Sequence, residues 1–242
     1  ERPVLDDQMR IVCWAHAVPG LYSPNGTMQY AGGSYQWMKN TICLSEAAEA
    51  KRRMDDVSVY DLINEEIASS EPGADGLIFL PHLMGERAPR WNANAKGVFY
   101  GITPTTTRAQ LLRSVMEGII LNLKLCYDIL MRDRKTMDAE PMMLVGGAAR
   151  SSEWQRCVAN CFGTDVHVPA LLEESTSMGA AVIAGVGSGI FKDFSAAEQF
   201  IQTAAIRQPE VQYAQAYRTL QRDTECLYQA LLPVYNRQDQ RR

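Results

Sequence analysis

The chain has 242 residues, of which 46% are hydrophobic and 21% are charged. That composition is typical of a soluble globular protein long enough to bury a substantial core. The formal net charge of −4 argues against a surface for nucleic acid or an anionic membrane, which would need clustered Lys and Arg. No stretch of the sequence reaches the length of a membrane span. The six cysteines form no C-x-x-C pair, which indicates free thiols in a reducing cytoplasm.

The first third of the chain is predicted to begin with two antiparallel strands and to continue as helices. Apolar runs separated by turn residues predict the strands, at 10–16 and 27–30. A turn between them is predicted at Pro24-Asn25-Gly26, because these residues favour turns. Helical or amphipathic periodicity follows in the segments 34–41, 45–55 and 57–68.

Strands and helices alternate in much of the remaining chain, which predicts parallel pairing and an α/β architecture. The expected strands are 76–80, 97–102, 142–145 and 165–168. The expected helices are 107–133, 153–162 and 177–187, followed by a helical tail from about residue 195 in which 213–235 is the longest piece. Thr107 and Gln110 have the spacing of a capping box at the start of the longest of the three helices.

A run of small residues, Gly146-Gly147-Ala148-Ala149, separates an expected strand from the helix that begins after Ser151. Small residues at such a junction let a ligand approach backbone N–H groups, and the start of a helix favours negative charge. A tight turn needs glycine for its backbone geometry alone, so the residues by themselves leave two interpretations open. The run matches neither the Walker A pattern nor G-x-G-x-x-G, so those two nucleotide-binding classes are disfavoured.

Several blocks of the sequence, taken in order and spacing, resemble the C-terminal domain of the FGGY carbohydrate kinases. The blocks are 16–20 (His-Ala-Val-Pro-Gly), 79–89, 97–117, 146–154 and 179–185. They are most like those of xylulose kinases, while gluconate kinases share the Gly-Glu-Arg-Ala-Pro and Asn-Ala-Lys-Gly segments closely. The resemblance implies an α/β domain of actin-like (RNase H-like) ATPase architecture with extra helices.

The resemblance implies that residues 1–242 are the C-terminal, nucleotide-side domain of a longer sugar kinase that uses ATP and Mg²⁺. D-xylulose is the first expected substrate and gluconate the alternative. Resembling kinases carry a catalytic Asp in a Gly-Gly-Asp segment and a Gly-Thr-Ser phosphate loop, and neither matches a segment of this chain. We therefore expect an N-terminal sugar-binding and catalytic domain as the partner, a parent protein of about twice this length, and no kinase activity from this chain alone. The start at Glu1, without Met, agrees with this interpretation.

A non-catalytic nucleotide-binding module is the alternative of another class, because some actin-like domains have no catalytic role. Such a module would keep the glycines around the adenosine without needing a companion domain. The long helices and the apolar tail favour a homodimer in either case.

The resemblance also carries over residue by residue to a nucleotide site. The expected contacts are Gly146, Gly147, Ala148, Ala149, Ser151, Gly32 and Gln36. The first four correspond to the segment that holds the adenosine, with Ala148 in place of the family's third glycine. Ser151 corresponds to a position that offers a polar group to the base. Gln36 is equally compatible with an ordinary surface position on a helix.

Other polar residues receive structural interpretations from the sequence. Glu86 and Arg87 are expected to form a local ion pair that orders a loop, in preference to a catalytic arginine. Glu117 is expected to be a solvated or capped carboxylate in a long helix. None of the three histidines is expected to act as a base, and the chain is expected to supply neither a catalytic residue nor a metal ligand.

Overall fold

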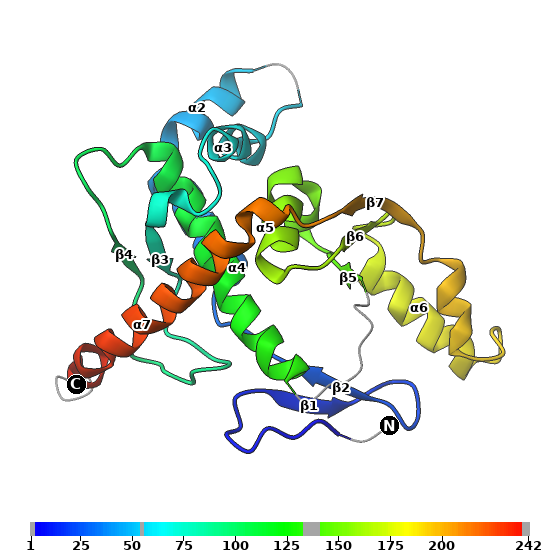
Figure 1. Cartoon of the computed structure of the whole chain (residues 1–242). Coiled ribbons are helices and arrows are strands. Elements are labelled where there is room, and N and C mark those ends of the chain that lie inside the picture. The colour runs from blue at the N-terminus through cyan, green and yellow to red at the C-terminus, as the bar shows by residue number, and fades with distance from the viewer. Residues whose placement is uncertain (1–2, 54–55, 133–140, 239–242) are drawn as a thin grey trace.

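The computed structural model describes residues 3–53, 56–132 and 141–238 (Figure 1). Its strands are β1 (Val12–Ala15), β2 (Tyr22–Asn25), β3 (Ile78–Leu80), β4 (Val98–Tyr100), β5 (Met142–Met143), β6 (Val166–Pro169) and β7 (Thr203–Arg207). Its α-helices are α1 (Ala31–Thr41), α2 (Leu44–Arg52), α3 (Val59–Ala68), α4 (Arg108–Met131), α5 (Ser152–Phe162), α6 (Ser175–Gly187) and α7 (Ala214–Gln238). Short 3-10 turns are η1 (Ala74–Gly76), η2 (Gly147–Arg150), η3 (Phe194–Gln199) and η4 (Val211–Tyr213).

Helix α4 is the centre of the molecule, and α7 crosses it in Figure 1. The predicted capping box starts it: the Gln110 N–H donates to the Thr107 hydroxyl at 3.2 Å, and the Gln110 side chain accepts the Thr107 N–H at 2.8 Å. Its central part, residues 112–122, is buried on every side, because α1, α3, α5 and β3 all pack against the helix. The main hydrophobic cluster lies around this central part and includes Met38, Ile63 and Trp154.

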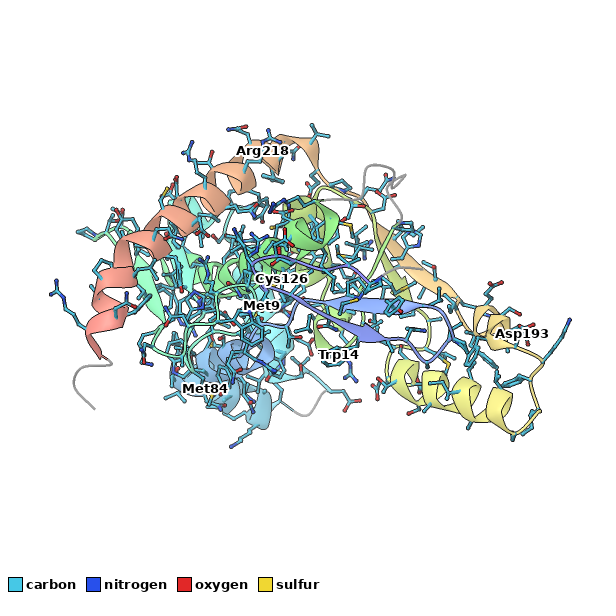
Figure 2. All side chains as sticks on the ribbon, turned by 90° about the horizontal axis from the view of Figure 1, so that it is seen from below. Met9, Trp14, Met84, Cys126, Asp193 and Arg218 are labelled. Atoms are coloured by element: carbon cyan, nitrogen blue, oxygen red, sulfur yellow. The ribbon has the colours of Figure 1, made fainter. Side chains whose placement is uncertain are left out.

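The strand pairs are short and lie around this helical core. β5 and β6 are parallel, with Met142 opposite Val166, so the parallel pairing expected for these two segments is confirmed. β7 adds to the other edge of β6 in antiparallel direction. β3 pairs with β4, and β1 pairs with β2, both antiparallel. Figure 2 shows the part of the chain that contains α6 extending away from the core, with Asp193 beyond the end of that helix.

Two sequence predictions of secondary structure are wrong. The second strand is β2, not 27–30, and it includes Pro24 and Asn25, which were predicted as a turn. Proline is tolerated in an edge strand, at a position whose N–H would face away from the partner strand, and both strands of a two-stranded ribbon are edge strands. The tail is not helical throughout, because β7 pairs with β6 before α7 begins. The ends predicted at residues 55 and 133 lie outside the described residues.

No helix in the described parts of the chain combines the length and apolar character needed to cross a membrane.

The segment before β1 is fastened by Asp6 and Arg10. The Asp6 carboxylate accepts hydrogen bonds from the Arg10 backbone N–H at 2.7 Å and from its Nε at 2.9 Å. These hydrogen bonds lower the pKa of Asp6 from 3.8 to about 2. A carboxyl whose pKa is lower in the folded state stabilises that state above its unfolded pKa, and the contribution disappears as the pH falls towards the folded value.

We therefore expect the Asp6→Asn substitution to lower the free energy of unfolding at pH 7 and to have much less effect near pH 2, where Asp6 is about half protonated in the folded native chain. Urea unfolding of both proteins at the two pH values measures this. An equal difference at both values would show that the charge of Asp6 does not contribute.

Candidate functional site

The turn between β5 and α5 contains two glycines with different structural demands. Gly146 has φ 82° and ψ −168°, a backbone conformation that is essentially restricted to glycine. Gly147 has no positive φ, and a Cβ built on it would meet nothing within 4 Å. The turn interpretation therefore explains Gly146, whereas the chain's own packing gives no reason for glycine at position 147.

The backbone of this turn faces outward. Gly146 and Gly147 are exposed, Ala148 is half-buried, and the Ala149 side chain is buried. Among the described residues, no acceptor is found for the N–H groups of Gly146, Gly147 and Ala148. Ala149 is only 1% exposed and its N–H donates to the Gly146 carbonyl oxygen at 3.1 Å, so this predicted contact offers no open surface to a ligand.

Ser151 begins α5 as its N-cap. Its Oγ accepts the Trp154 N–H at 3.4 Å, which leaves the hydroxyl hydrogen free to donate elsewhere. Gln155 supports the turn from behind, because its Nε2 donates to the Ala149 carbonyl oxygen at 2.6 Å. Arg207 in β7 donates in turn to the Gln155 side-chain oxygen at 3.0 Å. The turn is therefore fixed by α5 and β7 while its outer surface stays open.

The other predicted contacts lie on α1. Gly32 and Gln36 are both exposed and are one helical turn apart, so they share one face of the helix. A Cβ on Gly32 would meet nothing within 4 Å, whereas a Cβ on the neighbouring Gly33 would lie 2.4 Å from the Tyr30 ring. Glycine inside a helix costs about 1 kcal/mol relative to alanine. Packing explains that cost at Gly33 but not at Gly32.

A contact between two aromatic rings connects α1, which carries Gly32 and Gln36, with α5, which follows the small-residue turn. Tyr35, on the buried face of α1, meets the Trp154 ring edge-to-face with 5.1 Å between centroids. The Tyr35 hydroxyl donates to Asn64 at 2.8 Å, and burial raises the pKa of Tyr35 far above its ordinary value. Trp154 is the residue whose N–H Ser151 caps. One ring contact thus links the helix that carries Gly32 to the first turn of α5.

The first turn of α5 also contains a compensated negative charge. Glu153 is buried and lies 3.1 Å from Arg113 and 2.7 Å from Arg156. Two guanidinium groups therefore offset its charge next to the open turn. No group of three or more His, Cys, Asp or Glu residues is placed to hold a metal ion in the residues described.

Glu117 is not the solvated or capped carboxylate that the sequence predicted. Its Oε1 accepts the Gly73 N–H at 2.8 Å and the Tyr217 hydroxyl at 2.9 Å, and it lies 3.6 Å from Arg113. Burial raises the pKa of Glu117, and the hydrogen bond from Gly73 and the charge of Arg113 oppose the rise. The carboxylate joins α4, α7 and the turn before β3. The one sequence signal for this role is an Arg and a Glu four residues apart in an otherwise apolar stretch.

The predicted ion pair between Glu86 and Arg87 is also wrong. The Arg87 side chain is exposed, and within the described residues it pairs with no carboxylate. Glu86 is buried and instead accepts the Arg87 backbone N–H at 2.8 Å. His82 is fully buried beside it, with Nδ1 at 2.9 Å from Glu86 Oε2.

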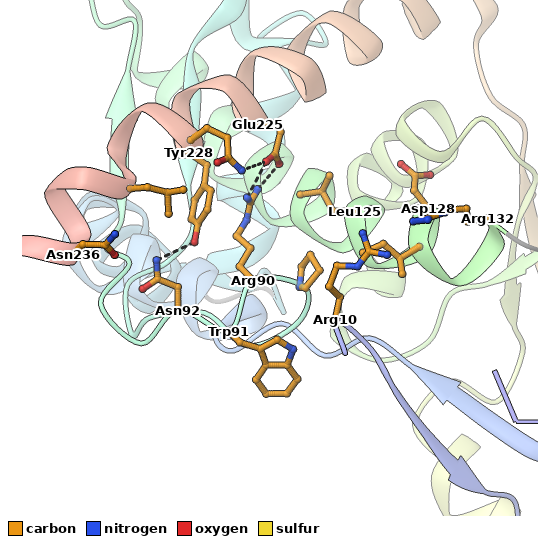
Figure 3. Close-up of a pocket in the computed structure, with 14 residues that line it drawn as sticks. Arg10, Arg90, Trp91, Asn92, Leu125, Asp128, Arg132, Glu225, Tyr228 and Asn236 are labelled. Carbon is orange, nitrogen blue, oxygen red and sulfur yellow. Dashed lines mark hydrogen bonds and ion pairs between the residues drawn. The ribbon is translucent and has the colours of Figure 1, made fainter. Parts of the chain in front are cut away.

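A hollow of about 750 Å³ lies elsewhere, between the 89–92 loop, the end of α4 and α7 (Figure 3). The Arg90 guanidinium lies 3.6 Å from the centroid of the Tyr228 ring and pairs with Glu225 at 2.9 Å. None of the seven predicted nucleotide contacts lines this hollow. Four of the predicted contacts, Gly146, Gly147, Gly32 and Gln36, are exposed on the surface outside this hollow.

The chain is similar to known kinases over most of its length. The model of the C-terminal domain of the FGGY family of carbohydrate kinases matches residues 5–188. Gluconokinase of Bacillus licheniformis is 31% identical over 226 residues, which cover 91% of this chain and 42% of the relative. Xylulose kinase of Staphylococcus epidermidis is 34% identical over 230 residues, which cover 91% of this chain and 43% of the relative. The chain thus spans less than half the length of these relatives.

Solved structures agree with this similarity. Ligand-bound xylulose kinase from Lactobacillus acidophilus has a TM-score of 0.81 at 26% identity, covering 98% of this chain and 45% of that protein. Gluconate kinase from the same organism has a TM-score of 0.80 at 26% identity with the same coverage. The predicted fold class, a sugar-kinase C-terminal domain of actin-like ATPase architecture, is confirmed. The family model covers more than half of the chain, and the chain therefore belongs to the FGGY family of carbohydrate kinases and matches its C-terminal domain.

Proposed function

We propose that this chain is the nucleotide-side domain of an ATP-dependent kinase that phosphorylates a sugar hydroxyl. Family membership supports the reaction class. The observation that carries the assignment of the site is the pair Gly32 and Gly147, two exposed glycines whose missing side chains leave open space. They lie on elements that the contact between Tyr35 and Trp154 holds together.

In this proposal, each predicted residue contacts a different part of the nucleotide. The free N–H groups of Gly146, Gly147 and Ala148 face the adenosine, and the Ser151 hydroxyl donates to the base. Gln36 contacts the nucleotide from α1, beside the open backbone at Gly32. When bound, ATP would supply the phosphoryl group, and Mg²⁺ would bind together with the nucleotide. The base that takes the sugar proton belongs to an N-terminal domain outside this chain, so the chain alone has no kinase activity.

We propose two candidate sugar substrates, in order of preference. We place D-xylulose first, because the xylulose kinase of Staphylococcus epidermidis is 34% identical to this chain. Gluconate is second, supported by the gluconokinase of Bacillus licheniformis at 31% identity. Because the residues that contact the sugar belong to the N-terminal domain, the sequence of this chain does not decide between the two sugars. Six free cysteines agree with a cytoplasmic enzyme. Homodimer formation stays a prediction.

Substituting the open glycines tests the nucleotide site. We expect Gly32→Ala and Gly147→Ala to fold as well as the native chain, because a Cβ at either position meets no other atom. Each new methyl group should instead occupy space needed by the nucleotide and weaken Mg·ADP binding about tenfold or more. Calorimetric titration measures the affinity, and thermal unfolding measures the fold.

The matched control is Gly187→Ala at the end of α6, another exposed glycine with open space in front of it and no predicted contact. It should leave the affinity unchanged. Native affinity in both test variants would contradict the proposed site.

A coupled phosphorylation assay separates the kinase from the non-catalytic module. The parent protein should turn over xylulose or gluconate, and this chain alone should turn over neither. A parent protein that binds Mg·ADP without turning over any sugar would favour the module. Turnover by the isolated chain would contradict the domain assignment.

A further inference from the structure

Glu86 is a buried carboxylate with partners in three separate segments. It is 5% exposed, and its Oε1 accepts the backbone N–H of Gln29 at 2.7 Å and that of Arg87 at 2.8 Å. Its Oε2 accepts from Asn122 Nδ2 at 2.9 Å and lies 2.9 Å from His82 Nδ1. Both oxygens are therefore used inside the protein, and neither is available to a substrate.

One of these hydrogen bonds reaches the start of α1. Gln29 lies two residues before Ala31, where the helix begins, and 57 residues away from Glu86 in the sequence. The Ser34 hydroxyl lies 3.3 Å from the Pro81 carbonyl oxygen of the same loop, but the Tyr30 carbonyl oxygen, at 2.6 Å, is the better acceptor for its single hydrogen. The hydrogen bond from Gln29 to Glu86 is therefore the stronger of these two polar contacts between the start of α1 and the loop that joins β3 to β4. A hydrogen bond between a carboxylate and an N–H is about twice as strong as a neutral one.

The opposite side of Glu86 is fixed by the core. Asn122 belongs to the buried central part of α4, and it is 3% exposed. His82 is completely buried, and its ring meets the Tyr228 ring edge-on with 5.4 Å between centroids. A carboxylate has no hydrogen to donate, so His82 Nδ1 is the donor to Glu86. Asn122 and His82 thus fix Oε2 of the carboxylate, and with it the position of Oε1, which accepts from Gln29.

We propose that Glu86 is a positioning residue for the nucleotide site. It sets the place of α1, with Gly32 and Gln36, relative to the open turn at Gly147. The proposal rests on the proposed function, because α1 matters to binding only if its exposed face contacts the nucleotide. Glu86 itself touches no substrate, since its carboxylate is buried and fully occupied.

Glu117 offers a matched control for a test of this proposal. It is also a buried carboxylate, and it accepts the backbone N–H of a distant residue, Gly73, at 2.8 Å. Glu86→Ala and Glu117→Ala should both lower the free energy of unfolding, because each leaves buried donors without an acceptor. Only Glu86→Ala should release α1.

Two measurements on the folded proteins distinguish the variants. Hydrogen exchange without nucleotide should accelerate in residues 28–39 of the Glu86→Ala chain and remain native there in the Glu117→Ala chain. Mg·ADP affinity, measured well below the unfolding temperature, should weaken about tenfold in Glu86→Ala and stay within about twofold in Glu117→Ala. Glu86→Gln keeps an oxygen for the Gln29 N–H and should restore most of the affinity. Glu86→Asp, whose carboxylate is one methylene shorter, replaces the alanine variant if that variant does not fold.

Each contrary result overturns the proposal. Native exchange in residues 28–39 of the Glu86→Ala chain would show that Glu86 does not hold α1. Faster exchange with native affinity would show that the position of α1 does not govern binding. Equal loss of affinity in the Glu117→Ala chain would reduce the role of Glu86 to general stability. If the native chain binds no Mg·ADP, the proposed function itself fails, and the native protein rather than a variant reveals it.

Discussion

Replacing Arg113 with methionine is expected to lower the free energy of unfolding by about 3–5 kcal/mol. Arg113 is 1% exposed and lies between two buried carboxylates, at 3.6 Å from Glu117 and 3.1 Å from Glu153. It also donates to the Ile67 carbonyl oxygen at 3.0 Å. Its removal leaves the Glu117 carboxylate buried without a cation. Removing one partner of a buried ion pair costs far more free energy than replacing both partners by apolar residues.

Urea unfolding with a matched variant measures this effect. Arg156→Met removes another arginine from Glu153, but the Arg156 side chain is 42% exposed, so we expect a loss of less than about 1 kcal/mol. Combining Arg113→Met with Glu117→Gln should recover part of the loss, because that protein no longer buries the unpaired charge. Equal small losses for the two arginines would contradict the role assigned to Arg113.

Gly118→Ala is expected to cost about 3 kcal/mol, although alanine is the better helix former by about 1 kcal/mol. A Cβ at position 118 would lie 2.2 Å from the Phe79 carbonyl oxygen and 3.1 Å from its carbonyl carbon. Both are backbone atoms of β3, so neither can rotate away as a side chain would. The substitution must therefore push α4 and β3 apart at the centre of the core.

Gly179→Ala in α6 is the control for this prediction. It is also a helical glycine, but it is exposed and a Cβ there would meet nothing within 4 Å. We expect it to raise the free energy of unfolding by about 0.5–1 kcal/mol. Thermal or urea unfolding of the two variants gives both numbers. A tolerated Gly118→Ala would mean that α4 and β3 separate easily.

The features predicted well from the sequence depend on neighbouring residues. The capping box at Thr107 is a local pattern, and the structure forms it as expected. The parallel pairing of β5 and β6 follows from the helix that connects them. β2 was misplaced because Pro24 and Asn25 favour a turn when read alone, whereas pairing with β1 extends them. β7 was missed because a short strand with two alanines has no clear local pattern until it lies beside β6.

The functional residues divide in the same way. The small-residue run at Gly146 was visible from the sequence, but only its φ shows that this glycine is required by backbone geometry while Gly147 is not. The sequence predicts Glu117 to be solvated or capped because most helices in small proteins have an exposed face, but α4 lacks one in its central part, residues 112–122. Two of the partners of Glu86, Asn122 and Gln29, lie 36 and 57 residues away, so no local pattern identifies them.

The most direct test of the nucleotide-side assignment is to map Mg·ADP binding by amide chemical shifts of the isotope-labelled chain. We expect the shifted amides to cluster in residues 146–151 and 32–36, the two segments linked by the contact between Tyr35 and Trp154. Shifts confined to the hollow around Arg90 and Tyr228, or none at saturating nucleotide, would contradict it.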